Sequence, residues 1–119
     1  MHNFEQIKNA TAAVILGKQI DSVEFVMDYL VVNFDYGALN FYTWPAIELD
    51  GKEYRYRDFK YRDIIRGFAG CVVSSLDITE EMFYLGLSEN RSIYCLLGSD
   101  EQEIPEEVEF SSHGVWWII

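Results

Sequence analysis

The chain has 119 residues, of which 50% are hydrophobic, and it carries a net charge of −11 at pH 7. A chain of this length is expected to form one domain with its own core, and this composition excludes an intrinsically disordered protein. No apolar run approaches the roughly 20 residues that a membrane-spanning helix needs. The opening "MHNFEQIKN" lacks the basic-then-apolar pattern of a signal peptide. We therefore predict a single cytoplasmic domain, residues 1–119, that does not enter a membrane.

Positive charge is concentrated in one short segment of this acidic chain. The stretch "KEYRYRDFKYRDIIR", residues 52–66, holds six bases and three acids, a net charge of +3. Residues 1–51 hold seven acids and two bases, and residues 67–119 hold ten acids and one base. A field dominated by negative charge repels nucleic acids and anionic lipids and attracts basic partners.

The first predicted element is a helix over residues 3–16. Phe4, Ile7 and Val14 fall on one face of it, because they recur at the spacing of helical turns. Asn3 is expected to cap its N-terminus.

Alternating apolar and aromatic residues predict antiparallel strands after this helix. Leu30, Val32 and Phe34 are expected to share one strand face. The "DYG" sequence at 35–37 predicts a turn into a return strand, "ALNFYTW", which ends before Pro45.

The basic segment is expected to begin as a hairpin strand and to end as a helix. Asp50-Gly51 predicts a tight turn, because both of its central positions need a positive φ. Residues 52–57 would form the second strand, and a helix capped by Asp58 would run to Gly67. Its basic side chains would then protect a sheet edge and pair with the acids around them.

A shift of 53 residues overlays the first half of the chain on the second. Gly17 falls on Gly70, and apolar positions coincide along the strands that follow. We interpret the chain as two pseudo-repeated units, residues 14–66 and 67–119, each with a helix and three or four antiparallel strands. The predicted fold class is α+β, with the two units forming one mainly antiparallel sheet or half-barrel.

Residues typical of catalysis are sparse. His2 and His113 have no spaced partner, and Cys71 and Cys95 are expected to be reduced thiols in buried strand positions. The chain lacks zinc-ligand spacing, a phosphate-binding loop, a dinucleotide glycine motif and a nucleophile elbow. We therefore predict that the protein is not an enzyme and that it holds no metal and no cofactor.

Two surfaces are candidates for binding. The first is basic and aromatic, and could stack on bases and contact phosphates of single-stranded nucleic acid or bind another ligand. Its residues are Tyr54, Arg55, Tyr56, Arg57, Lys60 and Arg62. Nucleic acid is the less favoured ligand, because phosphate contacts drive such affinity and the rest of the chain is strongly acidic.

The second candidate surface is acidic and suits a basic protein partner. Its acids are Asp77, Glu80, Glu81, Asp100, Glu101, Glu103, Glu106 and Glu107. Tyr42 and Trp44 are aromatic candidates for the same contact, since aromatic residues often dominate interface energies. The alternative is that these acids are solvated loop charges that keep the protein soluble.

Three stretches carry a resemblance to known proteins: "LGKQIDSVEFVMDYLVVNFDYGALNFY", "RDIIRGFAGCVVSSLDITEEMFYLGLSENRSIYCLL" and "IPEEVEF". Over most of residues 14–110 the chain resembles small acidic immunity proteins of bacterial contact-dependent growth inhibition and polymorphic-toxin systems. The resemblance implies a stoichiometric inhibitor that covers the active site of a cognate basic toxin, such as a nuclease. It implies no catalytic residue and no cofactor, and we expect a monomer or weak dimer.

Overall fold

The structure, a computed structural model, describes residues 3–97, 107–112 and 114–119. This part of the chain forms two helices and ten strands. They are α1 (Phe4–Ile15), β1 (Ile20–Val26), β2 (Tyr29–Phe34), β3 (Gly37–Phe41), β4 (Ala46–Leu49), β5 (Lys52–Tyr54), α2 (Tyr61–Arg66), β6 (Val73–Ile78), β7 (Met82–Leu87), β8 (Arg91–Leu96), β9 (Val108–Ser112) and β10 (Val115–Ile118). Neither of the described helices is long and apolar enough to cross a membrane.

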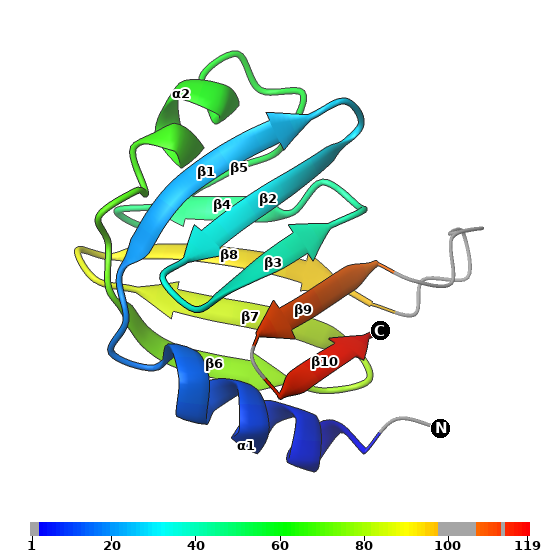
Figure 1. Ribbon diagram of the computed structural model, residues 1–119. Helices are drawn as coiled ribbons and strands as arrows, with labels where there is room; N and C mark the ends of the chain where they lie inside the picture. The colour runs from blue at the N-terminus through cyan, green and yellow to red at the C-terminus, as the bar shows by residue number, and fades with distance from the viewer. Residues whose placement is uncertain (1–2, 98–106, 113) are drawn as a thin grey trace.

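The described strands form two five-stranded antiparallel sheets that are not closed into a barrel (Figure 1). Sheet 1 has the order β1-β2-β3-β9-β10, and sheet 2 has the order β5-β4-β8-β7-β6. The α+β class is confirmed, but the expectation of one sheet or a half-barrel is wrong. After β3 the chain passes Pro45 and enters the other sheet as β4, because proline interrupts strand pairing.

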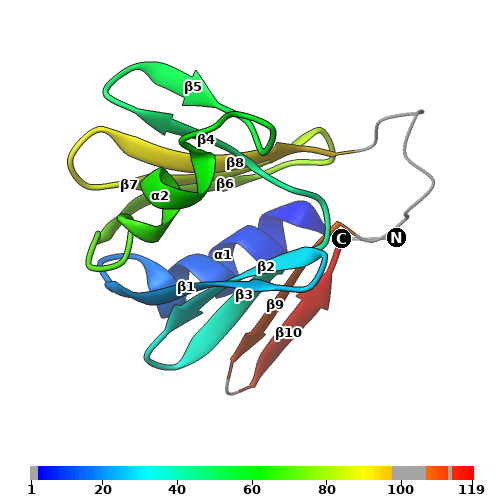
Figure 2. The same cartoon turned by 90° about the horizontal axis from the view of Figure 1, so that it is seen from above.

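Two packed sheets also solve a burial problem that one sheet would leave. Strands such as β2 alternate buried and partly buried residues, so a single sheet would expose a broad apolar face. Figure 2 shows the two sheets on opposite sides of the core, with α1 set between them. The helix α1 packs against β6 and β10, whereas α2 packs against β1 and β4. The two helices therefore cover different openings between the sheets.

The core consists of the inward side chains of both sheets. Sheet 1 contributes Leu30, Val32, Leu39, Phe41, Phe110 and Trp117, and sheet 2 contributes Ile47, Leu76, Phe83, Leu85 and Ile93. Burial of each such side chain stabilises the fold by about 1.5–3 kcal/mol. Phe41 and Phe83 meet edge to face across the two sheets with ring centres 5.6 Å apart. The Trp117 indole N–H donates to Thr11 Oγ1 at 2.6 Å, which ties α1 to the end of the chain.

Several local predictions are confirmed. The Asn3 side chain accepts the Gln6 N–H at 3.1 Å, and α1 begins one residue later. Alternate residues of β2 are buried, as the pattern of Leu30, Val32 and Phe34 predicts. Asp50 and Gly51 have φ values of 53° and 84° and connect β4 to β5.

The beginnings of β1 and β6 join the two sheets through equivalent hydrogen bonds. The Gly17 N–H donates to the Val73 carbonyl at 2.9 Å, and the Gly70 N–H donates to the Ile20 carbonyl at 2.7 Å. The donors Gly17 and Gly70 are 53 positions apart, and so are the acceptors Ile20 and Val73, so the two bonds are related by exchanging the two halves. Three consecutive strands of each half lie in one sheet and the next two lie in the other. The pseudo-repeat of 14–66 and 67–119 stays an interpretation, and this exchange of strands is the observation that favours it.

The basic segment differs from its prediction in two respects. The strand β5 ends at Tyr54, because the Asp58 carboxylate accepts the Arg55 N–H at 2.7 Å and closes a turn there. Asp58 therefore does not cap α2, which begins only at Tyr61 without a side-chain cap. Phe59 was expected on the helix, but it lies in the turn before it and is 99% exposed.

Candidate functional site

Three of the predicted acids gather at one edge of sheet 2. Asp77 lies on β6, and Glu80 and Glu81 are exposed at the turn from β6 to β7. Lys8 of α1 approaches Asp77 at 3.4 Å, between exposed side chains. Salt weakens exposed pairs of this kind, so the pair contributes little to stability.

The other predicted acids contribute less to the described surface. Asp100, Glu101, Glu103 and Glu106 lie outside the described residues. Glu107 is 4% exposed, so the expectation that it is a solvated loop acid is wrong. Its backbone begins the pairing of β9, with its carbonyl accepting the Tyr42 N–H at 2.8 Å. Burial, together with the charge of Glu107, raises the pKa of Cys95.

Tyr42 belongs to a polar cluster on the outer face of sheet 1. Its hydroxyl donates to Glu109 Oε1 at 2.6 Å, and the Asn40 amide donates to the same oxygen at 3.1 Å. The Trp116 indole N–H donates to Glu109 Oε2 at 2.8 Å, although Trp116 is 65% exposed. These hydrogen bonds, led by that of Tyr42, lower the pKa of Glu109. The bond to Glu109 and burial raise the pKa of Tyr42.

Trp44 lies away from Tyr42, within the alternative binding face. Its ring stacks on Tyr56 with ring centres 4.1 Å apart, and Phe25 lies 5.8 Å from it. The Arg62 guanidinium lies over Phe25 and Tyr56, at 4.7 and 5.3 Å from the ring centres. Arg66 also lies over Phe25, at 5.0 Å. Tyr56, which was expected to stack on a base, therefore contacts Trp44 and the Arg62 guanidinium within the protein.

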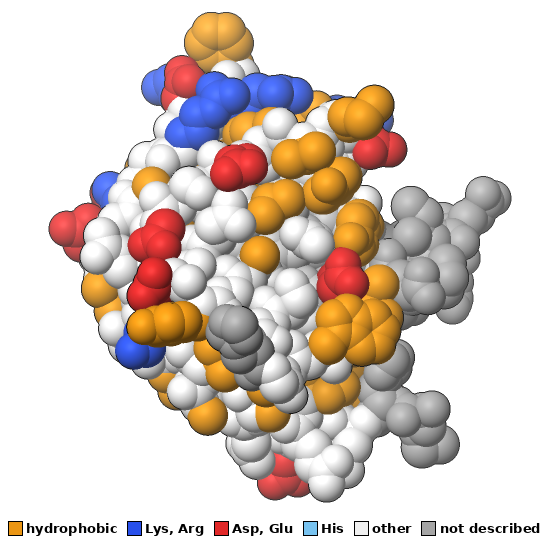
Figure 3. Space-filling view, viewed as in Figure 1, with side chains coloured by type: hydrophobic (Ala, Val, Ile, Leu, Met, Phe, Trp, Pro, Cys, Tyr) orange, Lys and Arg blue, Asp and Glu red, His pale blue; other side chains and the backbone are white. Residues whose placement is uncertain are grey.

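Basic side chains gather at the α2 end of the molecule, and hydrophobic side chains spread over the outer face of sheet 1 (Figure 3). Tyr54 faces Lys52 rather than Tyr56, with the ammonium group 5.1 Å from its ring centre. Arg57 and Lys60 are exposed. In the described residues of the basic segment, Arg55 alone has an ion-pair partner, Glu53 at 3.1 Å. The expected pairing with acids is therefore confirmed for Arg55, and β5 lies at an edge of sheet 2 as predicted.

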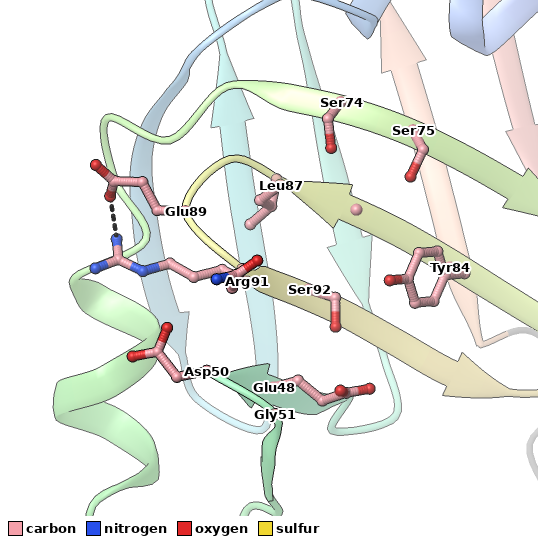
Figure 4. A pocket seen from close by; sticks show the side chains of 12 residues that line it. Glu48, Asp50, Gly51, Ser74, Ser75, Tyr84, Leu87, Glu89, Arg91 and Ser92 are labelled. Carbon is pink, nitrogen blue, oxygen red and sulfur yellow. Dashed lines mark ion pairs between the residues drawn. The ribbon is translucent and has the colours of Figure 1, made fainter.

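A shallow groove crosses the outer face of sheet 2 and has a volume of about 640 Å³. We call it the sheet 2 groove. Its lining side chains are mainly acidic or hydroxylic, and Figure 4 shows how they lie. They are Glu48, Asp50, Ser74, Ser75, Tyr84, Leu87, Glu89, Asn90, Arg91 and Ser92, together with Gly51 and Gly86.

One row of register partners forms the middle of this groove. Glu48 on β4 pairs with Ser92 on β8, Ser92 pairs with Gly86 on β7, and Gly86 pairs with Ser75 on β6. Paired residues point to the same side of a sheet, so the carboxylate and the two hydroxyls share one face. At the end of the row, Glu48 also pairs with Glu53, which accepts a hydrogen bond from the Tyr94 hydroxyl. The arrangement presents hydrogen-bond acceptors to solvent.

The only arginine in the groove lining of the described residues points away from its centre. Arg91 Nη1 donates to the Gly67 carbonyl at 3.1 Å and to Cys71 Sγ at 3.0 Å, behind the end of the sheet. It also approaches Glu89 at 3.5 Å (Figure 4). Arg91 therefore fastens the C-terminal end of α2 and leaves the middle of the groove acidic.

No pattern in the sequence predicted the sheet 2 groove. Its strands come from both halves of the chain, and no motif marks their pairing. The alternation in "VSSLDI" and "RSIYCL" does place Ser75 and Ser92 on outward faces, but Gly86 interrupts an otherwise apolar strand. The available signal therefore identified the faces of single strands and not the surface that they build together.

Chemically, the described surfaces offer carboxylates, hydroxyls and guanidinium groups. Within residues 3–97, 107–112 and 114–119, no group of three or more His, Cys, Asp and Glu residues could hold a metal ion. Comparisons with protein-family models, with curated proteins and with solved structures found no match to this chain. The function is therefore inferred from the charge and shape of these surfaces.

Proposed function

We propose that this protein is an immunity protein that binds and neutralises a cognate toxin domain. Binding is stoichiometric and occurs through the acidic surface of sheet 2, so that the partner's active site is covered. The toxin carries a basic surface, as a nuclease does, and substrate phosphates compete with the acids of this protein for it. The protein acts in the cytoplasm as a monomer or weak dimer, without a cofactor.

The observation that carries this proposal is the uncompensated charge of sheet 2. Ion pairs between described residues number three, and they involve Asp77, Glu53 and Glu89. Glu48, Glu80 and Glu81 have no described cation as partner. Since such a field steers a basic protein toward the surface, fast and salt-dependent association is expected.

The test begins with a rescue assay. The C-terminal segment of the protein encoded immediately upstream is expressed from an inducible promoter, and growth is measured with and without this protein. We expect growth arrest by the segment alone, and recovery together with co-purification when this protein is present. A segment that arrests growth without being rescued, or a harmless segment that does not co-purify, would contradict the proposal.

Association kinetics then test the acidic surface. The variant Asp77→Asn, Glu80→Gln, Glu81→Gln removes three charges beside sheet 2. The control variant Asp21→Asn, Asp28→Asn, Asp35→Asn removes three exposed charges at sheet 1. We expect the first variant to lower the association rate constant about tenfold at low salt and the control to lower it less. Equal effects of the two variants would show that net charge alone matters, and would remove sheet 2 as the contact surface.

A further inference from the structure

We propose that the sheet 2 groove is a recognition site for an arginine side chain of the protein partner. The identity of the partner rests on the proposed function, whereas the cation chemistry rests on the groove itself. Four observations on the described residues support it: a carboxylate without a cation, a hydroxyl without a protein partner, the small residue at the floor, and the length of the row.

The carboxylates supply the charge that a guanidinium requires. Glu48 and Asp50 line the groove, and neither forms an ion pair with any described residue. Arg91 also lines the groove, but its guanidinium donates to Gly67 and Cys71 and interacts electrostatically with Glu89 and Asp50, so Glu48 is the lining carboxylate left without a described cation. The field in the groove therefore remains negative, and protein walls on its floor strengthen that field relative to open water.

Ser92 supplies the second, independent indication of a ligand. Ser92 is 3% exposed, and its hydroxyl, which has no hydrogen-bond partner among the described residues, reaches solvent through the groove. Figure 4 shows this hydroxyl in the groove, between the positions of Tyr84 and Glu48. A hydroxyl that opens into a groove without a protein partner can donate to or accept from a ligand. An N–H donor placed beside Glu48 would reach both groups.

Gly86 shapes the floor of the groove. A Cβ atom at this position would collide with Ser75 Oγ and would lie 3.3 Å from Tyr84 Cε1. The absence of a side chain on β7 therefore lets the Ser75 hydroxyl lean over the strand toward the middle of the row. The floor is in consequence polar and open, between the ring of Tyr84 and the carboxylate of Glu48.

The dimensions of the row fit an extended side chain. Gly86, Ser92 and Glu48 occupy three neighbouring strands, so this part of the row spans two strand spacings of about 4.8 Å, or roughly 10 Å. An arginine can lie across it with its planar fork toward Glu48 and its stem over Gly86. Arginine is favoured over lysine, because a guanidinium offers several donors in one plane and stacks on aromatic rings such as Tyr84.

The experiment uses the full chain and a small probe. Amide signals of ¹⁵N-labelled protein are followed by NMR during titration with Nα-acetyl-arginine amide. The matched control probe is Nα-acetyl-citrulline amide, which has nearly the same shape without the charge. We expect saturable shifts at Ser75, Gly86 and Ser92 with the arginine probe only. We expect Glu48→Gln to weaken binding at least fivefold and Ser92→Ala to weaken it about threefold. Asp28→Asn, which removes an exposed charge between β1 and β2, should leave binding within a factor of two.

Each alternative outcome has a defined meaning. Equal shifts with citrulline, no shifts with arginine, or shifts centred on sheet 1 would overturn the proposal. The same spectra report folding, and if Glu48→Gln fails to fold, the comparison of the two probes on the unaltered protein decides. Arginine binding without rescue of growth would leave the groove in place and remove the toxin as partner. Rescue of growth without arginine binding would support the toxin as partner and would remove the groove as an arginine site.

Discussion

Replacement of Tyr61 by phenylalanine tests how the chain is held where it crosses between the sheets. Tyr61 is completely buried, and its hydroxyl donates to the Pro45 carbonyl at 2.6 Å, just before β4 begins. The substitution removes one hydroxyl and leaves a buried carbonyl without its donor. An unmade buried hydrogen bond of this kind costs about 1–3 kcal/mol, so we expect Tyr61→Phe to lower the free energy of unfolding by that amount at pH 7.

The pH dependence of the free energy of unfolding provides a second test of the same prediction. Burial raises the pKa of Tyr61 above its ordinary value of 10.0, with smaller contributions from the charges of Cys95 and Tyr56. Below pH 10 the residue is protonated in the folded and unfolded states alike, so its contribution to stability is fully present. Above pH 10 the unfolded chain loses this proton while the folded chain keeps it. Stability then falls by about 1.4 kcal/mol per pH unit until the folded pKa is reached.

The assay is urea unfolding followed by fluorescence at pH 7, 9, 10 and 11 with a reductant present. The difference in free energy of unfolding between the unaltered protein and Tyr61→Phe should be constant up to about pH 10 and should decrease above it. Tyr36→Phe is the control, because the Tyr36 side chain is exposed and its loss should change stability by less than about 0.5 kcal/mol. The reasoning would be refuted if Tyr61→Phe had the same free energy of unfolding as the unaltered protein at pH 7 and if the difference between them did not change with pH.

Two further predictions concern sheet 1. Glu109→Gln should destabilise the protein at pH 7, because hydrogen bonds from Tyr42 and Trp116 lower the pKa of Glu109 in the folded state. This loss of stability should be present above the ordinary pKa of 4.5 and should vanish as the pH falls through the pKa of Glu109 in the folded protein. Urea midpoints between pH 2.5 and pH 7 measure it, and a difference independent of pH would contradict it. Gly37→Ala should cost about 1–3 kcal/mol, since the new Cβ would lie 2.7 Å from the Ser111 carbonyl oxygen. Thermal unfolding measures that cost, and an unchanged midpoint would show that β3 and β9 separate freely at this point.

The sequence predicted the residue types of the candidate site but not the contacts between them. The acidic character of the second half and the exposed turn at Glu80 and Glu81 follow from composition and local pattern. Glu107 was misplaced, because burial depends on the strand partner that covers a side chain. Trp44 and Tyr56 carried no sign that they would stack on each other, since 11 residues and a turn separate them. Contacts across such distances depend on how the chain crosses between sheets.

The sequence by itself determined the local structure of this protein. Helical spacing and Asn3 fixed α1, the alternation of apolar residues fixed the inward faces of the strands, and Asp50-Gly51 fixed a hairpin through its positive φ angles. These features depend on neighbours within a few residues, so one chain segment contains all the information about them.

Only the tertiary structure decided which strands became neighbours. The passage at Pro45 brings β4 beside β8, a pairing between residues more than 40 positions apart in the chain. That pairing creates the row from Glu48 to Ser75 and hence the sheet 2 groove. A strand's outward face is specified by its own alternation, but its partner is selected by how the two apolar faces close on each other. The surface that binds therefore emerges from packing, which no single stretch of the sequence records.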